Sequence, residues 1–228
     1  MIVAVTGPTG HIGANLIRAL LNKGYKVRAL VHNNQQALES LNVEIIKGDV
    51  SDLYSLTKAF TGAEIVYHLA ANISLSMNNW PEVEAVNVTG TRNVVEACIS
   101  SGVHRLVHFS SIHAMTQEPL NQILDERRPL VDGKDCPPYD RSKAAGEIQV
   151  REGIEQGLDA VILNPTSVIG PYDYQLSHMG EVFLALAQGK LPALVEGGFD
   201  WVDVRDVADG AIRAARATGS TATGGSGV

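Results

Sequence analysis

Short apolar runs alternate with amphipathic stretches along most of the chain. The apolar runs predict strands at residues 2–6, 26–31, 43–48, 64–70, 105–110 and 159–165. The amphipathic stretches predict helices at residues 12–23, 51–60, 81–101 and 139–156. Short strands separated by helices are typical of a parallel sheet that is covered on both faces. The pattern therefore predicts a doubly wound α/β fold.

After Pro165 the alternation becomes irregular. A loop leads to a helix near residues 180–188 and to a short apolar piece near 192–195. The last residues, TGSTATGGSGV, are small and polar and cannot bury much apolar surface. We therefore divide the chain into a main domain at 1–165, a smaller region at 166–217, either complete or truncated, and a flexible tail at 218–228.

Three glycines separate the first strand from the first helix, in the sequence TGPTGHIG. Gly7 permits a tight turn, Gly10 lets the backbone approach a pyrophosphate, and Gly13 lets the helix pack closely. The helix N-terminus adds free N–H groups and the positive end of its dipole. The pattern predicts a phosphate cradle, although its spacing is G-x-x-G-x-x-G and not the commoner G-x-G-x-x-G. The alternative is a plain strand–turn–helix junction.

Further motifs follow in order along the chain. They are GDVSD at 48–52, HLAA at 68–71, NVTGTRNVVEAC at 87–98, HFSSIHA at 108–114, YDRSK at 139–143, NPTSVIGP at 164–171 and WVDVRDVADGAIRA at 201–214. Together with the glycine loop, they resemble the extended short-chain dehydrogenases/reductases, the NAD-dependent epimerase/dehydratase family, and most of all its bacterial dihydroflavonol-reductase-like members. The resemblance covers nearly the whole chain before the tail. It implies a Rossmann-type fold in which residues 1–165 bind a dinucleotide and residues 166–217 bind the substrate.

The resemblance assigns cofactor-binding residues position by position. It implies that Asp49 hydrogen-bonds the adenine amino group, that Val50 packs on the adenine ring, and that Ala70 and Ala71 lie under the ribose and nicotinamide. By residue type alone, Asp49 also reads as a turn or helix-cap aspartate. The full set implied for the cofactor is Gly7, Thr9, Gly10, His11, Ile12, Gly13, His32, Asp49, Val50, Leu69, Ala70, Ala71, Tyr139, Lys143, Asn164, Pro165, Thr166 and Val168.

The end of the second predicted strand lacks an acidic residue. A carboxylate at this place usually holds the ribose 2′-hydroxyl of NAD, and a basic residue accommodates the 2′-phosphate of NADP. This chain has His32 followed by two asparagines, and no Asp or Glu comes before Glu39. The sequence therefore favours NADP(H) over NAD(H). Arg28 is close in sequence, but it also reads as a solvated strand residue.

Tyr139 and Lys143 are four residues apart, so a helix places both side chains on one face. A neighbouring ammonium, with the positive charge of an oxidised nicotinamide, would bring the phenol pKa down from its ordinary value near 10. This spacing also arises by chance, and the upstream sequence HFSS at 108–111 is what makes it informative. The pair predicts a tyrosine that acts as general acid and base.

The resemblance adds Ser111 and Asn87 to the catalytic residues Tyr139 and Lys143. Ser111 would hydrogen-bond the substrate oxygen and Tyr139, with Ser110 ranked second, and Asn87 would support Lys143 directly or through water. Otherwise Ser111 reads as a cap or turn residue and Asn87 as a helical or capping amide. The residues expected to touch substrate are Ser111, His113, Asn72 and Tyr172, with a structural role as the alternative for His113.

Composition narrows the partners and the location. A formal charge of −7 and a pI near 5.5 argue against nucleic acid or an anionic membrane. No apolar run approaches the roughly 18–20 residues of a membrane span, and Met1 leads into a strand rather than a signal peptide. We therefore expect a cytoplasmic protein in which Cys98 and Cys136 are buried thiols, with no disulfide and no metal. A serine hydrolase is a poor fit, because the chain has no G-x-S-x-G.

The favoured function is a reductase or dehydrogenase that moves a hydride between nicotinamide and a carbonyl or hydroxyl carbon. Aromatic and amide groups in the loops at 72–80 and 112–138 and after Pro165 suit a small carbonyl or sugar-like substrate. The alternatives are a nucleotide-sugar epimerase or dehydratase with tightly held NAD, and a dinucleotide sensor without turnover. Relatives are usually longer, and they commonly dimerise through helices that correspond to 81–101 and 139–156, so we expect a homodimer.

Overall fold

The computed structural model describes residues 1–74, 76–193 and 196–217. The tail at 218–228, which the sequence predicts to be flexible, lies outside the described residues. Two residues of the apolar piece expected near 192–195 also lie outside them.

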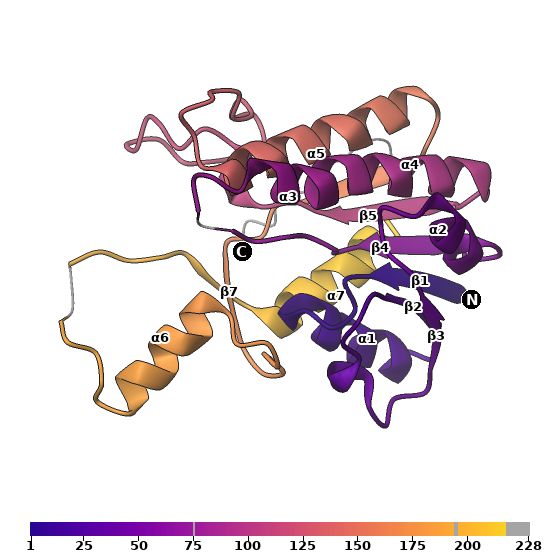
Figure 1. Ribbon diagram of the computed structural model, residues 1–228, viewed down its shortest axis with the longest axis horizontal. Coiled ribbons are helices and arrows are strands. Elements are labelled where there is room, and N and C mark those ends of the chain that lie inside the picture. The colour runs from indigo at the N-terminus through magenta and orange to yellow at the C-terminus, as the bar shows by residue number, and fades with distance from the viewer. Residues whose placement is uncertain (75, 194–195, 218–228) are drawn as a thin grey trace.

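A parallel sheet forms the centre of the molecule (Figure 1). Its strands are β1 (Ile2–Thr6), β2 (Lys26–Val31), β3 (Val43–Lys47), β4 (Ile65–His68), β5 (Arg105–Phe109) and β6 (Ala160–Leu163). They lie in the order β3-β2-β1-β4-β5-β6, and every neighbouring pair is parallel. The strand order reverses between β1 and β4, and sheets of this kind bind ligands at that point, beyond the carboxyl ends of the strands. The predicted doubly wound sheet is confirmed.

Helices cover both faces of this sheet (Figure 1). One layer consists of α1 (His11–Asn22) and α7 (Val204–Ala214), and the other of α2 (Leu53–Phe60), α4 (Gly90–Ser100) and α5 (Pro138–Glu155). Along β1, Val3 and Val5 face the α1 layer while Ala4 faces the α2 and α4 layer. Each face thus encloses its own apolar core, which is why the strands are apolar throughout.

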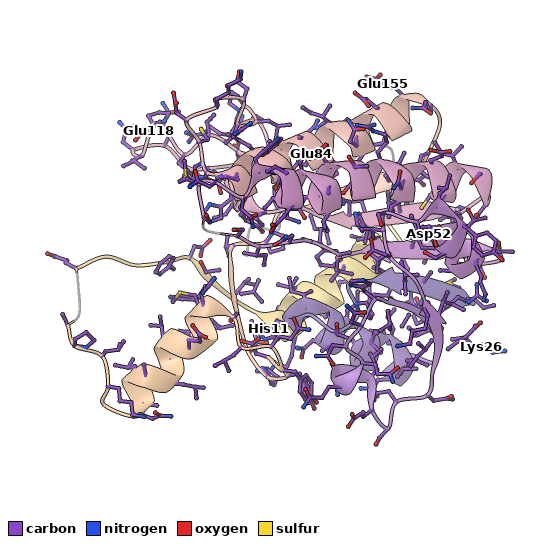
Figure 2. The ribbon with its side chains drawn as sticks, in the orientation of Figure 1. His11, Lys26, Asp52, Glu84, Glu118 and Glu155 are labelled. Carbon is purple, nitrogen blue, oxygen red and sulfur yellow. The ribbon has the colours of Figure 1, made fainter. Side chains whose placement is uncertain are left out.

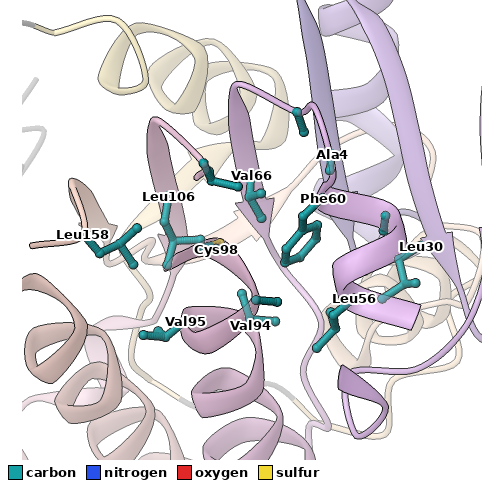
Figure 3. Packing of buried hydrophobic residues seen from close by; sticks show 14 of the residues in the cluster. Ala4, Leu30, Leu56, Phe60, Val66, Val94, Val95, Cys98, Leu106 and Leu158 are labelled. Atoms are coloured by element: carbon teal, nitrogen blue, oxygen red, sulfur yellow. The ribbon is translucent and has the colours of Figure 1, made fainter. Parts of the chain in front are cut away.

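Figure 3 shows the core on the α2 and α4 side. Phe60 and Val94 meet Val66 and Leu106 of the sheet there, and all four are fully buried. Cys98 belongs to this core. Cys136 is only partly buried, so the expectation of two buried thiols is right for Cys98 alone.

The helix expected at 81–101 consists of three consecutive parts. α3 (Trp80–Glu84) passes into a π-helical segment (Ala85–Thr89), and α4 follows directly. Asn87 lies in the π-helical segment, and a Cβ on Gly146 of α5 would lie 2.7 Å from the Asn87 carbonyl oxygen. Glycine at 146 therefore lets α5 pack directly against this segment. Such local departures from α-helix often mark functional sites.

The region after Pro165 contains a short parallel pair of strands and a separate helix. β7 (Ser167–Ile169) pairs with β8 (Trp201–Asp203), and α6 (His178–Ala187) stands away from the sheet (Figure 1). None of the α6 residues is buried, and Phe183 contacts Trp201 with ring centroids 5.3 Å apart. Short helices also occur at Gln36–Leu38 and Ile112–Ala114. The sequence pattern did not predict β7, β8 or α7, and the proposed division at residue 165 stays a prediction.

Candidate active site

The glycine loop forms where the sequence predicts it. Gly7 has φ +65°, and a Cβ there would lie 2.6 Å from the Ala70 nitrogen, so the loop touches the end of β4. A Cβ at Gly13 would overlap the Gly7 carbonyl oxygen, so glycine is what lets α1 begin this close to the loop. No side chain caps α1 at Gly10. The open helix N-terminus therefore fits an anionic pyrophosphate.

The segment after β7 lies across the start of α1. His11 Nε2 is 3.2 Å from the Gly170 carbonyl oxygen, and Asn15 donates to the Pro171 carbonyl oxygen at 2.8 Å. Figure 2 shows His11 where α1 meets this segment. Thr9, Ile12, Pro165, Thr166 and Val168 are partly buried near the same end of the molecule. Their roles toward a cofactor stay predictions.

His32 and Asp49 lie together beyond β2 and β3. The His32 side chain is 69% exposed, and its Nδ1 is 3.9 Å from an Asp49 carboxylate oxygen. The Asp49 carboxylate accepts a hydrogen bond from the Ser51 N–H at 2.8 Å. Burial opposes ionisation of Asp49, but the bonds from Ser51 and the nearby His32 outweigh it and lower its pKa. Asp49 is thus a turn residue, whereas Asp52 caps α2.

Arg28 and Val50 both lie against other parts of the chain. Arg28 is not the solvated strand residue of the alternative reading, because it pairs with Glu44 at 2.9 Å and donates to the carbonyl oxygens of Ala59 and Thr61. Val50 is buried in the core, where a Cβ on Gly90 would lie 2.6 Å from its side chain. The exposed His32 follows β2, at the position where the sequence leads us to expect a 2′-phosphate.

Tyr139, Lys143 and Ser111 come together where α5 begins beside the end of β5. The Lys143 ammonium is buried, donates to the Phe109 carbonyl oxygen at 2.9 Å and lies 6.0 Å from the centre of the Tyr139 ring. Burial lowers the pKa of Lys143 to about 8, although Glu147 opposes this. Burial also raises the pKa of Tyr139 to about 12, partly offset by the Ser111 hydroxyl. The expected lowering of the Tyr139 pKa is therefore not a property of the chain alone.

Asn87 is fully engaged by its neighbours. Its amide nitrogen donates to the Asn72 carbonyl oxygen at 2.9 Å and to the Ser142 hydroxyl at 2.8 Å, and its amide oxygen accepts from the Asn72 N–H at 2.8 Å. Asn87 thus contacts the residue before Lys143, whereas Lys143 itself bonds Phe109. Asn87 positions α5 and the Asn72 backbone.

His113 lies beside Tyr139. Its ring meets the Tyr139 ring edge to face, with centroids 6.2 Å apart, and its Nδ1 is 3.4 Å from the Asp140 carboxylate. The hydrogen bond with Asp140 raises the pKa of His113, although partial burial opposes this. The Ser111 hydroxyl also accepts the His113 N–H at 3.2 Å, so the cap role considered for Ser111 is real. Both residues nevertheless border the Tyr139 side chain.

Tyr172 contacts α1, and its expected contact with substrate stays a prediction. Its ring lies under the Arg18 guanidinium of α1, 4.1 Å from the centroid, and its φ is +63°. The Tyr174 hydroxyl accepts a bond from the same guanidinium at 3.1 Å. The aromatic pair therefore fastens the segment after β7 to α1.

Asn164 acts through a buried carboxylate that sequence reasoning missed. Its amide nitrogen donates to Glu147 Oε1 at 2.6 Å and to the Ser111 carbonyl oxygen at 3.1 Å. Glu147 is 1% exposed and also meets Arg151 at 3.4 Å. The sequence could have indicated Glu147 by its spacing, because a residue four positions after Lys143 lies on the same helix face. Asn164 therefore joins α5 to the backbone of Ser111.

The geometry agrees with what sequence comparison finds. The chain matches a family model described as the NAD dependent epimerase/dehydratase family over residues 3–225. The chain belongs to this family. Members similar to it include sterol demethylase protein B of Methylococcus capsulatus, 40% identical over 211 residues, or 91% of this chain and 63% of that protein. A putative dihydroflavonol 4-reductase of Synechocystis is 36% identical over 212 residues, which are 92% of this chain and 62% of that protein.

A solved structure of the same fold contains a cofactor. The Bordetella bronchiseptica enzyme WbmH in complex with NAD+ superposes with a TM-score of 0.84 at 25% identity, over 96% of this chain and 73% of that one. This family member thus spans a little under two thirds of the two curated relatives and about three quarters of WbmH. The extended short-chain dehydrogenase/reductase resemblance is confirmed.

Within residues 1–74, 76–193 and 196–217, every helix is too short or too polar to span a membrane. No three His, Cys, Asp or Glu side chains gather there as a metal site would require.

Proposed function

We propose that this chain is an NAD(P)-dependent oxidoreductase that acts on a carbonyl or hydroxyl carbon of a small or sugar-like substrate. The observation that carries the proposal is the meeting of Tyr139, buried Lys143 and Ser111 at the carboxyl edge of the sheet, where the glycine loop also lies. Similarity to a putative dihydroflavonol 4-reductase favours a reductase among the family's activities.

Each residue has a distinct chemical task in this proposal. Tyr139 exchanges a proton with the substrate oxygen, and the Lys143 ammonium stabilises the phenolate that forms. The Ser111 hydroxyl donates a hydrogen bond to the same oxygen as negative charge develops. A nicotinamide dinucleotide would supply the hydride donor or acceptor, with its pyrophosphate at the glycine loop, its adenine at Asp49 and its nicotinamide ribose at Lys143.

Replacing Tyr139 tests the mechanism. Tyr139→Phe removes the proton but keeps the ring, so turnover should fall by about 10²-fold or more while cofactor affinity stays unchanged. NADPH consumption with added carbonyl compounds measures turnover, and a cofactor fluorescence titration measures affinity. Tyr54→Phe is the matched control, because Tyr54 is 78% exposed on α2. Full turnover in Tyr139→Phe would refute the proposed mechanism.

We further propose that NADP(H) is preferred over NAD(H). The support is the run of residues after Val31, where the exposed His32 precedes two asparagines and no Asp or Glu comes before Glu39. The Asp49 carboxylate, 3.9 Å from His32, is bonded to the Ser51 N–H. Parallel titrations with NADPH and NADH should give tighter binding of NADPH. Tighter NADH binding would contradict the role given to His32 in NADP(H) preference. It would also favour the second candidate function, an epimerase or dehydratase.

An epimerase or dehydratase is that second candidate, favoured by the family description and by the NAD+ bound to WbmH. Such enzymes return their cofactor unchanged, so net NAD(P)H consumption separates the two functions. The homodimer and the cytoplasmic location stay predictions. Ile99 of α4 and Ile148 of α5 are exposed and available to the expected dimer interface.

A further inference from the structure

His68 ends β4 and is 1% exposed, yet neither the proposed chemistry nor the cofactor assignment uses its side chain. Both ring nitrogens are bonded. Nδ1 lies 2.7 Å from the Thr6 hydroxyl, and Nε2 lies 3.0 Å from the Thr91 hydroxyl. The imidazole therefore bridges the strand before the glycine loop and the helix that follows Asn87.

The hydroxyl partners fix which nitrogen carries the proton. Thr91 donates its only hydroxyl proton to the Asn87 carbonyl oxygen at 2.7 Å, so it can only accept from His68. Nε2 must then carry the hydrogen, and Nδ1 accepts from Thr6. The Thr6 hydroxyl in turn accepts the Ala70 N–H at 3.2 Å. One continuous chain of hydrogen bonds thus runs from Ala70 through Thr6, His68 and Thr91 to Asn87.

The two ends of this chain lie at functional places. Ala70 borders Gly7 of the phosphate loop, and Asn87 bonds Ser142, the residue before Lys143. The Asn87 carbonyl that accepts from Thr91 also lies where α5 packs closely at Gly146. A change in the loop at Ala70 would therefore reach the helix that carries Tyr139 and Lys143.

The surroundings keep the imidazole neutral. Burial, together with the charge of Lys143 on α5, lowers the pKa of His68 to about 3. Among the described residues, the titratable side chains that face it from packed elements are Lys143 of α5 and His108 of β5, whose ring centroid is 5.2 Å away. Burial also holds the pKa of His108 well below its ordinary value. Protonation of His68 would remove the acceptor that Thr6 needs.

We propose that His68, as a neutral imidazole protonated on Nε2, is a positioning residue that couples the glycine loop at Ala70 to Asn87 and the α5 helix of Tyr139 and Lys143. The proposal rests on the proposed oxidoreductase function for its effect on turnover. The hydrogen-bond chain itself is independent of that function.

Nitrogen-15 NMR of the full chain tests the tautomer without any activity. His68 should show an Nε2-protonated neutral ring whose signals do not move between about pH 5.5 and 8.5, the range in which an ordinary histidine titrates. Cofactor addition should shift the His68 Nε2–H resonance. An Nδ1-protonated ring, or titration of His68 in this range, would overturn the proposal.

Turnover variants test the coupling. His68→Leu should lower kcat about tenfold with little change in cofactor affinity, corresponding to about 1.4 kcal/mol. Thr91→Val should lower kcat similarly, and the double variant should be no worse than either single one, because both changes break the same chain. Additive losses would overturn the coupling.

His108→Leu is the matched control. His108 is equally buried, but within the described part of the chain neither of its ring nitrogens has a hydrogen-bond partner. Replacing His108 should lower kcat much less than replacing His68 does. Equal losses of kcat in the two variants would mean that the effect comes from disturbed packing and not from the hydrogen-bond chain. Absence of turnover in the unaltered chain would refute the proposed function, while the NMR measurement would still decide the hydrogen-bond chain.

Discussion

Lys143 is an ammonium group that has almost no access to water. Its neighbours are the Phe109 carbonyl oxygen, the Tyr139 ring and, one helical turn away, the buried Glu147. A buried cation loses hydration that these groups replace only in part. The residue proposed to stabilise a phenolate is therefore also expected to lower the stability of the folded chain.

The pH dependence of stability should reveal this cost. The pKa of Lys143 is about 8 in the folded chain and 10.5 ordinarily, so between these values the unfolded chain binds a proton that the folded chain has released. The free energy of unfolding should then rise with pH across this window, by about 3 kcal/mol. Below pH 8 both states hold the proton and the full cost of the buried charge remains.

Urea unfolding of the unaltered chain and of Lys143→Met, from about pH 7 to pH 10, measures the effect. The difference between the two isolates Lys143, because other titrating groups are common to both. A difference that does not change with pH would mean that Lys143 keeps an ordinary pKa.

Residue-level reasoning succeeded where short spacing determines geometry. Tyr139 and Lys143 share a helix face because they are four residues apart on α5. Position 7 requires glycine because a Cβ there would lie 2.6 Å from the Ala70 nitrogen. It failed for Arg28, whose partners lie 16 residues or more away in sequence at Glu44, Ala59 and Thr61. A single sequence shows no such long-range partners, so they could not be predicted.

At the scale of elements, α1 depends on its contact with the glycine loop. A Cβ at position 13 would overlap the Gly7 carbonyl oxygen, and neither backbone segment can move without moving its strand or helix. Gly13→Ala should therefore lower the free energy of unfolding by about 1–3 kcal/mol and weaken cofactor binding. Denaturant unfolding and cofactor titration measure the two effects.

Gly210→Ala is the control for that change. Gly210 lies in α7, and a Cβ there would have no atom within 4 Å. Alanine should stabilise the helix at this position by about 0.5–1 kcal/mol. Equal destabilisation by both substitutions would contradict the close contact at Gly13.

The sequence predicted the elements of the main domain better than those after Pro165. Periodicity gave β1 and β2 with their observed bounds, because buried parallel strands are continuously apolar. It did not show the π-helical segment, because a single π-helical turn of five residues is too short to have an apolar period of its own. α7 was missed because its polar face dominates its composition, and its small apolar face becomes visible only against α1.

At the scale of the whole molecule, Arg18 connects the two regions of the chain. Its guanidinium lies over Tyr172 and donates to the Tyr174 hydroxyl, which holds the segment after β7 against the helix of the phosphate cradle. Tyr172 keeps a positive φ in this arrangement. A non-glycine residue in that conformation is held there by its surroundings.

Arg18→Ala should release this segment. A cation–π contact at an exposed site is worth about 0.5–1 kcal/mol, so opening should become several times more frequent. Limited proteolysis near residues 170–177 should accelerate accordingly, while cofactor affinity stays unchanged. Arg92→Ala is the control, because Arg92 bonds only Gln149 in the described hydrogen bonds of its side chain. An unchanged cleavage rate in Arg18→Ala would contradict the link.

The layer formed by α1 and α7 joins the beginning of the chain to its later part. The two helices share one apolar core, and Arg216 donates to the Tyr25 hydroxyl at 2.7 Å across 191 residues of sequence. During synthesis, α1 leaves the ribosome well before residues 204–214, which cover part of its inner face. A nascent chain would expose this face until α7 has been made, and chaperones can bind it in that interval. The helix that would cradle the phosphates is thus completed only when a distant segment of the chain arrives.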